Sequence, residues 1–179
     1  MAPETSIKLT YEDYAAIPDD GRRHEIIDGE HYVNPAPNFK HQVVLVRLVT
    51  ALYQHVSDRR LGHVVPAPFD VILSEHDVVQ PDIVFISHAR AHLLTPANMQ
   101  GAPDLLVEVL STNRSYDERV KYRLYEHAGI LEYWIVNPFD DTIKAFRLAN
   151  KKYALVDLGD LITSPLLPGF QLRVADLFV

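Results

Sequence analysis

The segment PDLLVEVLS, residues 103–111, most limits how this chain can fold. Apolar side chains occupy both sides of its strand alternation, which is typical of a buried strand: Leu105, Leu106, Val107, Val109 and Leu110. Glu108 stands in the middle of this run. Because removing a carboxylate from water costs several kcal/mol unless a partner compensates the charge, Glu108 indicates either a functional site or a structural ion pair.

The composition is that of an ordinary globular protein. The 179 residues are enough for one domain with a hydrophobic core, and 47% of them are hydrophobic while 23% are charged. We therefore expect a single domain over residues 1–179. No apolar run is long enough to span a bilayer, and MAPETSIKLT lacks the apolar region of a signal peptide. The absence of cysteine excludes disulfides and thiolate metal sites and favours a cytoplasmic location.

The charge balance argues against nucleic-acid binding by bulk electrostatics. The formal net charge is −7, whereas phosphate binding normally uses clustered Lys and Arg. Two short basic pairs occur, Arg59-Arg60 and Lys151-Lys152. We interpret them as a solvated helix end and a solvated loop.

The hydrophobic periodicity predicts alternating helices and strands without a repeat or a linker. In chain order we expect a short helix after Thr10, a hairpin at 24–33, a helix at about 41–58, strands in 63–73 and 78–87, a loop with a helical piece at 88–101, the strand of Glu108, a helix ending near Ala128, a strand at 132–138 and a hairpin formed by 142–148 and 152–158. A short strand and a helical turn end the chain. The central order is helix, strand, strand, strand, helix, strand, which predicts an α/β (α+β) fold: a mixed sheet flanked by helices, with an N-terminal helix and hairpin and a C-terminal hairpin.

Local signals place several element ends. Thr10 with Asp13, and Ser115 with Glu118, have the spacing of helix N-terminal caps. Asp28-Gly29 supplies a two-residue turn that needs positive φ, and Gly129 is placed to end the second long helix.

Two carboxylates lie on adjacent predicted strands. Asp82 follows Pro81 at the beginning of an apolar strand, and Glu108 lies inside the next one. If these strands are neighbours, the side chains converge, and two close carboxylates repel each other unless a cation or a proton intervenes. Mg²⁺ prefers oxygen ligands and takes one or two carboxylates. The alternatives are a strand-end residue for Asp82 and a structural ion pair for Glu108.

Lys121 is the candidate cation for this pair. Helical spacing places it on the same face as Asp117 and Tyr125, on the helix that follows the Glu108 strand. It could orient a metal-bound water or offset charge on phosphorus. The alternative is a solvent-exposed lysine paired with Asp117.

Three segments together resemble the Uma-two family of restriction-endonuclease-like proteins, which belongs to the PD-(D/E)xK nuclease superfamily. They are QPDIVF (80–85), APDLLVEVLS (102–111) and YDERVKYRLYEHAGILEYWIVNP (116–138). The resemblance extends over nearly the whole chain through RRHEIIDGE at 22–30, KHQ at 40–42 and SPLLPGF at 164–170. It implies a restriction-endonuclease-like sheet with the core order αβββαβ.

The resemblance also implies a site. The family motif places the metal carboxylates on Asp82 and Glu108, helped by the backbone carbonyl of Val109. The superfamily lysine is expected two residues after the glutamate, where this chain has Leu110, so its role is expected to move to Lys121. Glu25 in the first hairpin is marked as a further catalytic residue, with an ordinary polar hairpin residue as the alternative.

The histidines show no compact metal-ligand spacing. His24 and His31 could meet across the first hairpin, although solvent-exposed strand residues are the simpler interpretation. His41 lies in the family-like segment and could approach a phosphate or a metal-bound water, but the sequence alone does not identify it as catalytic.

Three functions follow from these features. The first is an endonuclease that uses Mg²⁺ or Mn²⁺ to hydrolyse DNA phosphodiester bonds. The second is a non-catalytic member of the same fold that binds nucleic acid or protein, and the third is a metal-dependent hydrolase of a small phosphorylated substrate. Because duplex cleavage needs two strand breaks, we also expect a homodimer, with Tyr133, Trp134 and Phe146 as candidate contact residues.

Overall fold

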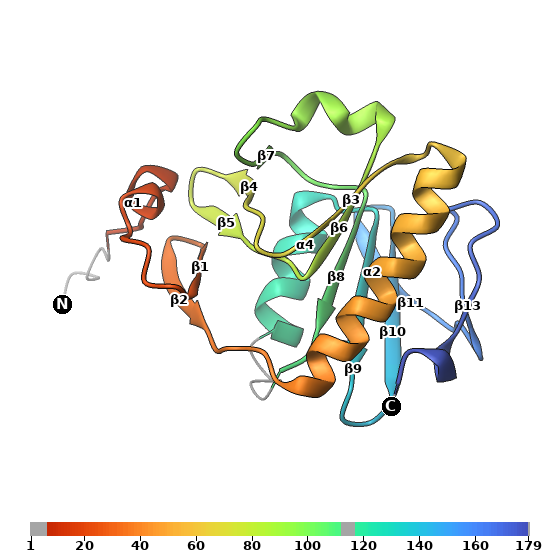
Figure 1. Ribbon diagram of the computed structural model, residues 1–179. Helices are drawn as coiled ribbons and strands as arrows, with labels where there is room; N and C mark the ends of the chain where they lie inside the picture. The colour runs from red at the N-terminus through yellow and green to blue at the C-terminus, as the bar shows by residue number, and fades with distance from the viewer. Residues whose placement is uncertain (1–6, 112–116, 179) are drawn as a thin grey trace.

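The computed structural model describes residues 7–111 and 117–178 (Figure 1). Its helices are spread along the chain between the strands. The α-helices are α1 (Tyr11–Ala15), α2 (Phe39–Arg59) and α4 (Tyr122–Ala128). A π-helical segment, η2 (Asp117–Lys121), leads directly into α4. Two short 3₁₀ helices also lie within the described residues, η1 (His88–Leu93) and η3 (Val174–Asp176).

A six-stranded sheet forms the centre of the molecule. Its strand order is β11-β10-β9-β8-β6-β3, and β8 pairs with β9 in parallel while the other pairs are antiparallel. The strands are β3 (Gly62–Pro66), β6 (Ile83–Ser87), β8 (Leu105–Val109), β9 (Glu132–Asn137), β10 (Thr142–Ala149) and β11 (Lys152–Val156). The expected core order is therefore present as α2, β3, β6, β8, α4 and β9, and the predicted mixed α/β architecture is confirmed.

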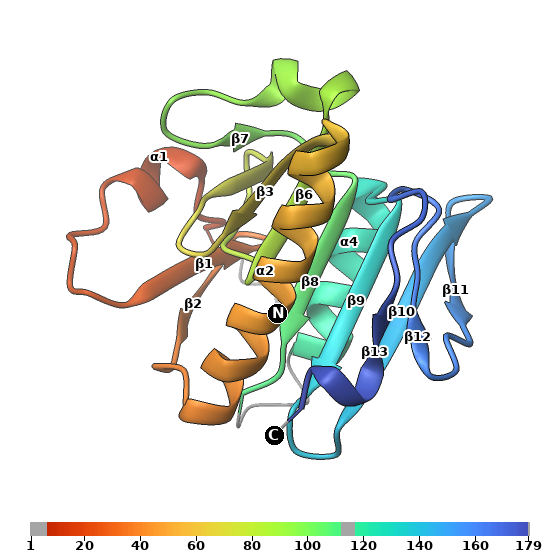
Figure 2. The same cartoon turned by 45° about the vertical axis from the view of Figure 1, so that its right-hand side comes forward.

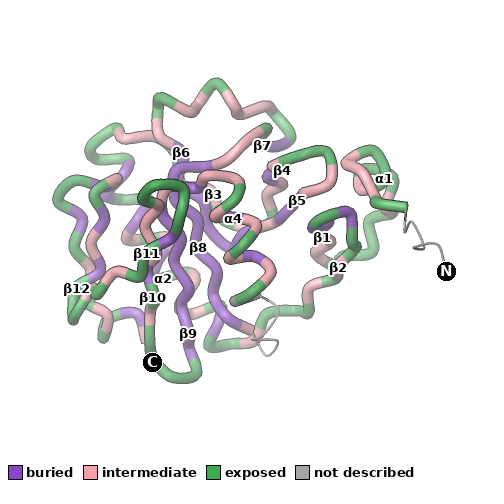
Figure 3. Tube along the Cα trace, turned by 180° about the vertical axis from the view of Figure 1, so that it is seen from behind, coloured by how far each residue is buried: buried purple, intermediate pink, exposed green. Residues whose placement is uncertain are grey.

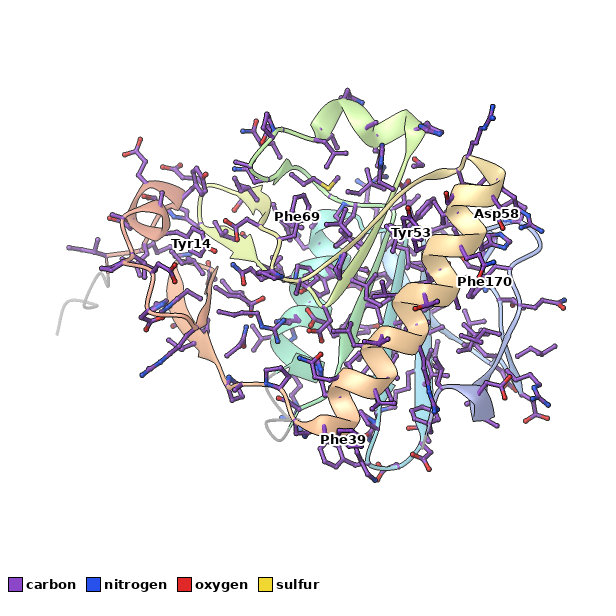
Figure 4. All side chains as sticks on the ribbon, in the orientation of Figure 1. Tyr14, Phe39, Tyr53, Asp58, Phe69 and Phe170 are labelled. Atoms are coloured by element: carbon purple, nitrogen blue, oxygen red, sulfur yellow. The ribbon has the colours of Figure 1, made fainter. Side chains whose placement is uncertain are left out.

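Helices α2 and α4 cover opposite faces of this sheet (Figures 1 and 2). Odd-numbered residues of β8 pack with α2, together with Trp134 and Phe170, in one buried cluster. On the opposite face, Leu106 and Leu110 pack with Tyr125 of α4 in the second buried cluster. Phe170 contacts His55 of α2 edge to face, and Figure 4 labels Phe170 beside α2. The buried residues follow β6, β8 and β9 in Figure 3. Strand alternation thus directs Glu108 toward α4.

A second sheet, which contains the N-terminal hairpin, lies beside the first. Its order is β2-β1-β5-β4-β7, and β4 pairs with β7 in parallel. The strands are β1 (Arg23–Ile27), β2 (Glu30–Asn34), β4 (Val71–Ser74), β5 (Asp77–Val79) and β7 (Met99–Gln100). Near the C-terminus, β12 (Leu161–Ile162) pairs with β13 (Leu172–Arg173).

The chain passes between the two sheets five times, and two of these passages correct the expected strands at 63–73 and 78–87. Each range holds two strands that belong to different sheets, β3 and β4 in the first and β5 and β6 in the second. The breaks contain Pro68 and Pro81. Proline cannot donate to a strand ladder, so these residues interrupt the pairing where the chain leaves one sheet for the other.

Several local predictions are confirmed. Thr10 and Asp13 form a capping box at α1, and Gly129 ends α4 with a φ of 77°. Asp28 and Gly29 both have positive φ in the turn between β1 and β2. Ser115 and the side chain of Glu118, the other predicted cap, lie outside the described residues.

The aromatic residues expected at a dimer contact belong to the core instead. Tyr133 and Trp134 are fully buried, and Phe146 packs against Tyr133 with ring centroids 6.1 Å apart. These aromatic residues therefore no longer support a homodimer, which stays a prediction. Among the described residues, no helix is both long and apolar enough to cross a membrane.

Candidate active site

Asp82 and Glu108 meet at the junction of the two sheets. Ile83 pairs with Val107 in antiparallel register, so the preceding Asp82 and the following Glu108 lie opposite each other. Both side chains line one small cavity of about 20 Å³. Its other lining residues are Arg23, Asn34, Pro35, Gln80, Val109, Ser111 and Lys121. The expected convergence of Asp82, Glu108 and Lys121 is therefore present.

Glu108 is held by two side chains from the next helical segment. Its Oε1 accepts hydrogen bonds from Lys121 Nζ at 3.0 Å and from Tyr125 Oη at 2.7 Å. Glu108 is only 5% exposed and Lys121 only 2%. Burial, followed by the negative charges of Glu108 and Glu25, raises the pKa of Tyr125 well above its usual value, so its hydroxyl remains a donor.

Glu25 belongs to the same cluster, which overturns its interpretation as an ordinary polar hairpin residue. It is completely buried, and Lys121 Nζ lies 3.0 Å from its carboxylate. Its two oxygens also accept hydrogen bonds from the backbone N–H of Gln80 at 2.8 Å and from Asn34 Nδ2 at 2.9 Å. Lys121 therefore bridges Glu25 of the small sheet and Glu108 of the large one, and it is not the exposed lysine of the alternative interpretation.

Asp82 has a separate set of donors. Arg23 donates to Oδ1 at 2.8 Å, while the Val109 backbone N–H at 2.8 Å and His41 Nε2 at 3.2 Å contact Oδ2. Burial alone would raise the pKa of Asp82, but His41 and Arg23 outweigh it and bring the pKa to about 2. Asp82 is thus a carboxylate at neutral pH.

Sequence reasoning missed the second cation of the cluster. We named Lys121 as the candidate cation for the two carboxylates, whereas Arg23 and His41 also face Asp82. Arg23 and Glu25 are two residues apart on β1 and therefore share a face, a spacing that could have revealed the arginine. His41 was noted but not placed. It is 2% exposed on α2, and no residue of the described ranges forms a hydrogen bond with its Nδ1.

The donor set suits one hard cation held by few protein ligands. The carboxylates of Asp82 and Glu108 and the backbone of Val109 share a cavity with about the room of one water molecule. No group of three or more His, Asp or Glu side chains fit for a metal occurs within residues 7–111 and 117–178. Mg²⁺ commonly takes only one or two carboxylates, so two oxygen-donor side chains fit it better than they fit Zn²⁺.

His24 and His31 do meet across the first hairpin. His24 Nδ1 lies 2.9 Å from His31 Nε2, and His24 Nε2 lies 2.8 Å from Asp20 Oδ1. This chain of contacts is outside the Asp82 cavity, whose lining includes neither histidine.

These features define an α/β protein in which a buried cluster of carboxylates and a lysine lies at a cavity where the two sheets meet. The chain belongs to the Uma2 family, which carries the description "Putative restriction endonuclease" and whose model matches residues 11–175. The family resemblance seen in the sequence is thereby confirmed.

Two individual proteins are also similar to this chain. The uncharacterized protein slr1290 of Synechocystis sp. is 29% identical over 134 residues, which cover 72% of this chain and 68% of that protein. The crystal structure of a "putative nuclease belonging to DUF820" from Anabaena variabilis matches with a TM-score of 0.79 at 20% identity. That match covers 94% of this chain and 97% of the other, and it shows that the two share a fold.

Proposed function

We propose that this protein is a Mg²⁺-dependent endonuclease that hydrolyses DNA phosphodiester bonds. The observation that supports the proposal most is the meeting of Asp82, Glu108 and Lys121 at one cavity, although they lie on separate elements. Membership of a family described as restriction endonucleases agrees with this chemistry. Mn²⁺ is the alternative ion.

Asp82, Glu108 and the carbonyl of Val109 would hold the ion. A bound divalent cation would supply Lewis acidity toward the phosphate and lower the pKa of water. Asp82 is suited to this role because its pKa of about 2 keeps it ionised. Its carboxylate accepts three hydrogen bonds within the described residues, and a carboxylate offers about four lone-pair sites, so acceptor capacity remains.

Lys121 would position the attacking water and offset negative charge that develops at phosphorus. Glu25 and Tyr125 fix the lysine and Glu108 in place through the hydrogen bonds described above. Arg23 lines the same cavity and supplies a second cation beside Asp82. We assign Glu25 a positioning role, since its contacts are with Lys121, Asn34 and the backbone of Gln80.

One observation favours a second candidate, the non-catalytic member of the same fold. The buried carboxylates contact Lys121, Arg23 or His41, which is also how a purely structural ion-pair network would look. The third function, hydrolysis of a small phosphorylated substrate, is disfavoured because a cavity of about 20 Å³ does not enclose such a molecule.

The test combines cleavage and unfolding. Mixed DNA substrates are incubated with Mg²⁺ or Mn²⁺ and either the native protein or Glu108→Gln, and both proteins are melted with and without the ion. The proposal expects cleavage by the native protein alone. It also expects Mg²⁺ to stabilise the native protein by about 2.7 kcal/mol at roughly 100 times the dissociation constant, and Glu108→Gln much less.

Glu132→Gln is the matched control. Glu132 is also a buried strand glutamate with a cationic partner, Arg147 at 3.1 Å, but it does not line the cavity. This variant should lose stability and keep both cleavage and the response to Mg²⁺. A native protein that melts identically with and without the ion, and that leaves every DNA substrate intact, would support the non-catalytic candidate instead.

A further inference from the structure

A large basic hollow lies on the side of α4 that faces away from the Asp82 cavity. It has a volume of about 960 Å³, and its walls come from the η2–α4 segment and from the hairpin of β10 and β11. The lining residues are Arg119, Tyr122, Arg123, Glu126, His127, Gly129, Leu148, Lys151 and Lys152. We call this surface the basic hollow. Figure 3 looks onto this side of the molecule, where α4 lies next to the β10–β11 hairpin.

The basic hollow concentrates positive charge on an otherwise acidic chain. Four Lys and Arg residues line it, against one carboxylate, while the whole chain carries −7. Glu126 is already engaged, because it accepts hydrogen bonds from Lys152 Nζ and from the Tyr153 backbone N–H, both at 2.8 Å. Within the part of the chain that the structure describes, Arg119, Arg123 and Lys151 form no ion pair. Three cations therefore remain to face a ligand.

The backbone at Lys151 gives a second, independent indication. Asn150 and Lys151 form the two-residue turn between β10 and β11 and have φ values of 51° and 63°. The second position of such a turn favours glycine, and a side chain there costs on the order of 1 kcal/mol. With a lysine in place of glycine at this position, the fold is less stable, but the lysine adds its charge to the basic hollow.

Aromatic packing makes part of the wall rigid. The Tyr122 ring packs edge to face against Phe146 at 5.1 Å and against Tyr153 at 5.3 Å between centroids. Arg119 and Arg123 are exposed and lie four residues apart, so they project from neighbouring turns on the same face as Tyr122. The Tyr122 ring is thus held in place between the two arginines on the wall of the basic hollow.

We propose that the basic hollow binds the phosphate backbone of a nucleic acid, outside the site of hydrolysis. Arginine presents a planar fork of N–H donors that matches phosphate oxygens, and the hollow offers two such groups. Lys121 projects from the other face of the same helical segment, and a helix with its side chains is about 10–12 Å across. A strand held in the hollow is therefore close to the Asp82 cavity. This role as a substrate contact rests on the proposed nuclease function, whereas backbone binding itself requires no cleavage.

The experiment measures binding of fluorescently labelled single-stranded and duplex DNA by anisotropy, in EDTA and over a range of salt concentrations. The test variant is Arg123→Ala with Lys151→Gly. The matched control is Arg59→Ala with Arg60→Gly, which removes the same charge from an exposed helix arginine and from a cation at a positive φ of 52°. Because glycine suits the turn, Lys151→Gly should leave the melting temperature equal or higher, so that a loss of binding does not reflect unfolding.

The native protein should bind DNA with a salt-dependent affinity. In the test variant, the slope of log affinity against log salt for the single strand should fall by about 1.4, since each lost phosphate contact removes about 0.7. The affinity at low salt should fall by about tenfold or more, while the control stays within about twofold of the native protein.

Three results would overturn the inference: no DNA binding by the native protein, equal losses in test and control variants, or displacement by poly-glutamate at lower concentration than by DNA. The last result would assign the basic hollow to an acidic protein segment. Cleavage assays with Mg²⁺ separate this inference from the proposed function. If the native protein binds DNA through the hollow but does not cleave it, only the proposed nuclease function is refuted. If the test variant cleaves DNA and binds it like the native protein, only the proposed role of the basic hollow is refuted.

Discussion

Replacing Lys121 by methionine tests how much the fold depends on the cluster. Lys121 is 2% exposed and lies 3.0 Å from both Glu25 and Glu108, which are themselves buried. Methionine has a similar length and no charge, so the change leaves the packing nearly filled and removes the shared cation. Two buried carboxylates then lose their nearest positive group.

The expected loss is about 3 kcal/mol. Breaking a buried ion pair by removing one partner costs about 3–5 kcal/mol. The lower end applies because Glu25 keeps hydrogen bonds from Gln80 and Asn34, and Glu108 keeps the one from Tyr125. For a domain of this size each kcal/mol corresponds to about 2–4 °C, so the melting temperature should fall by about 6–12 °C.

Urea unfolding followed by circular dichroism measures this difference, with an unchanged m-value as the check that the unfolded state is the same. Adding Glu25→Gln to Lys121→Met removes one of the two uncompensated charges and should recover about 1 kcal/mol or more of the lost stability. A loss below about 1 kcal/mol for Lys121→Met, or a double variant less stable than the single one, would refute the view that Lys121 compensates both carboxylates.

Three further outcomes are expected. Folding lowers the pKa of Asp82 from 3.8 to about 2, so its stabilising contribution of about 2 kcal/mol is complete above pH 4 and is lost as the pH falls through 2. Asp82→Asn should therefore make the free energy of unfolding less dependent on pH in that window. Identical acid-unfolding curves for the native protein and the variant would contradict this. Gly62→Ala should cost about 2 kcal/mol or more, because a Cβ there would lie 2.0 Å from the Ile86 carbonyl oxygen at a φ of 153°, and near-native urea stability would count against it. Trp134→Ala should cost about 3–5 kcal/mol from the core, and a variant that keeps its stability but changes its mass in light scattering would restore the aromatic dimer contact.

Features that depend on a few neighbouring residues were predictable from the sequence. The Asp28-Gly29 turn, the Thr10 cap and the Gly129 helix end are local, because backbone conformation and capping there involve residues at most a few positions apart. Glu108 was identifiable for a different reason: a carboxylate in an apolar strand is costly wherever it is placed.

Features that depend on which segments become neighbours were not predictable in the same way. Periodicity describes the faces of a strand but not its partner, so β3 and β4 looked like one strand although they belong to different sheets. His41 and Arg23 face Asp82 from 41 and 59 residues away in the chain. Nothing in their immediate surroundings indicates that contact. Likewise, the sequence does not show that Lys151 and Arg123 are neighbours. They line one hollow only because the β10–β11 hairpin packs beside α4.

The repeated passage of the chain between the two sheets has a consequence for its synthesis. Arg23 and Glu25 leave the ribosome early on the small sheet, while Glu108 and Lys121 arrive much later on the large sheet and its helix. The first hairpin therefore carries two charges whose partners come from later segments. Asp82, which pairs with Arg23, follows when nearly half of the chain has been made, and Lys121, which pairs with Glu25, follows at about two thirds. The complete cavity therefore exists only when the two sheets are docked, because Arg23 comes from one sheet and Glu108 from the other.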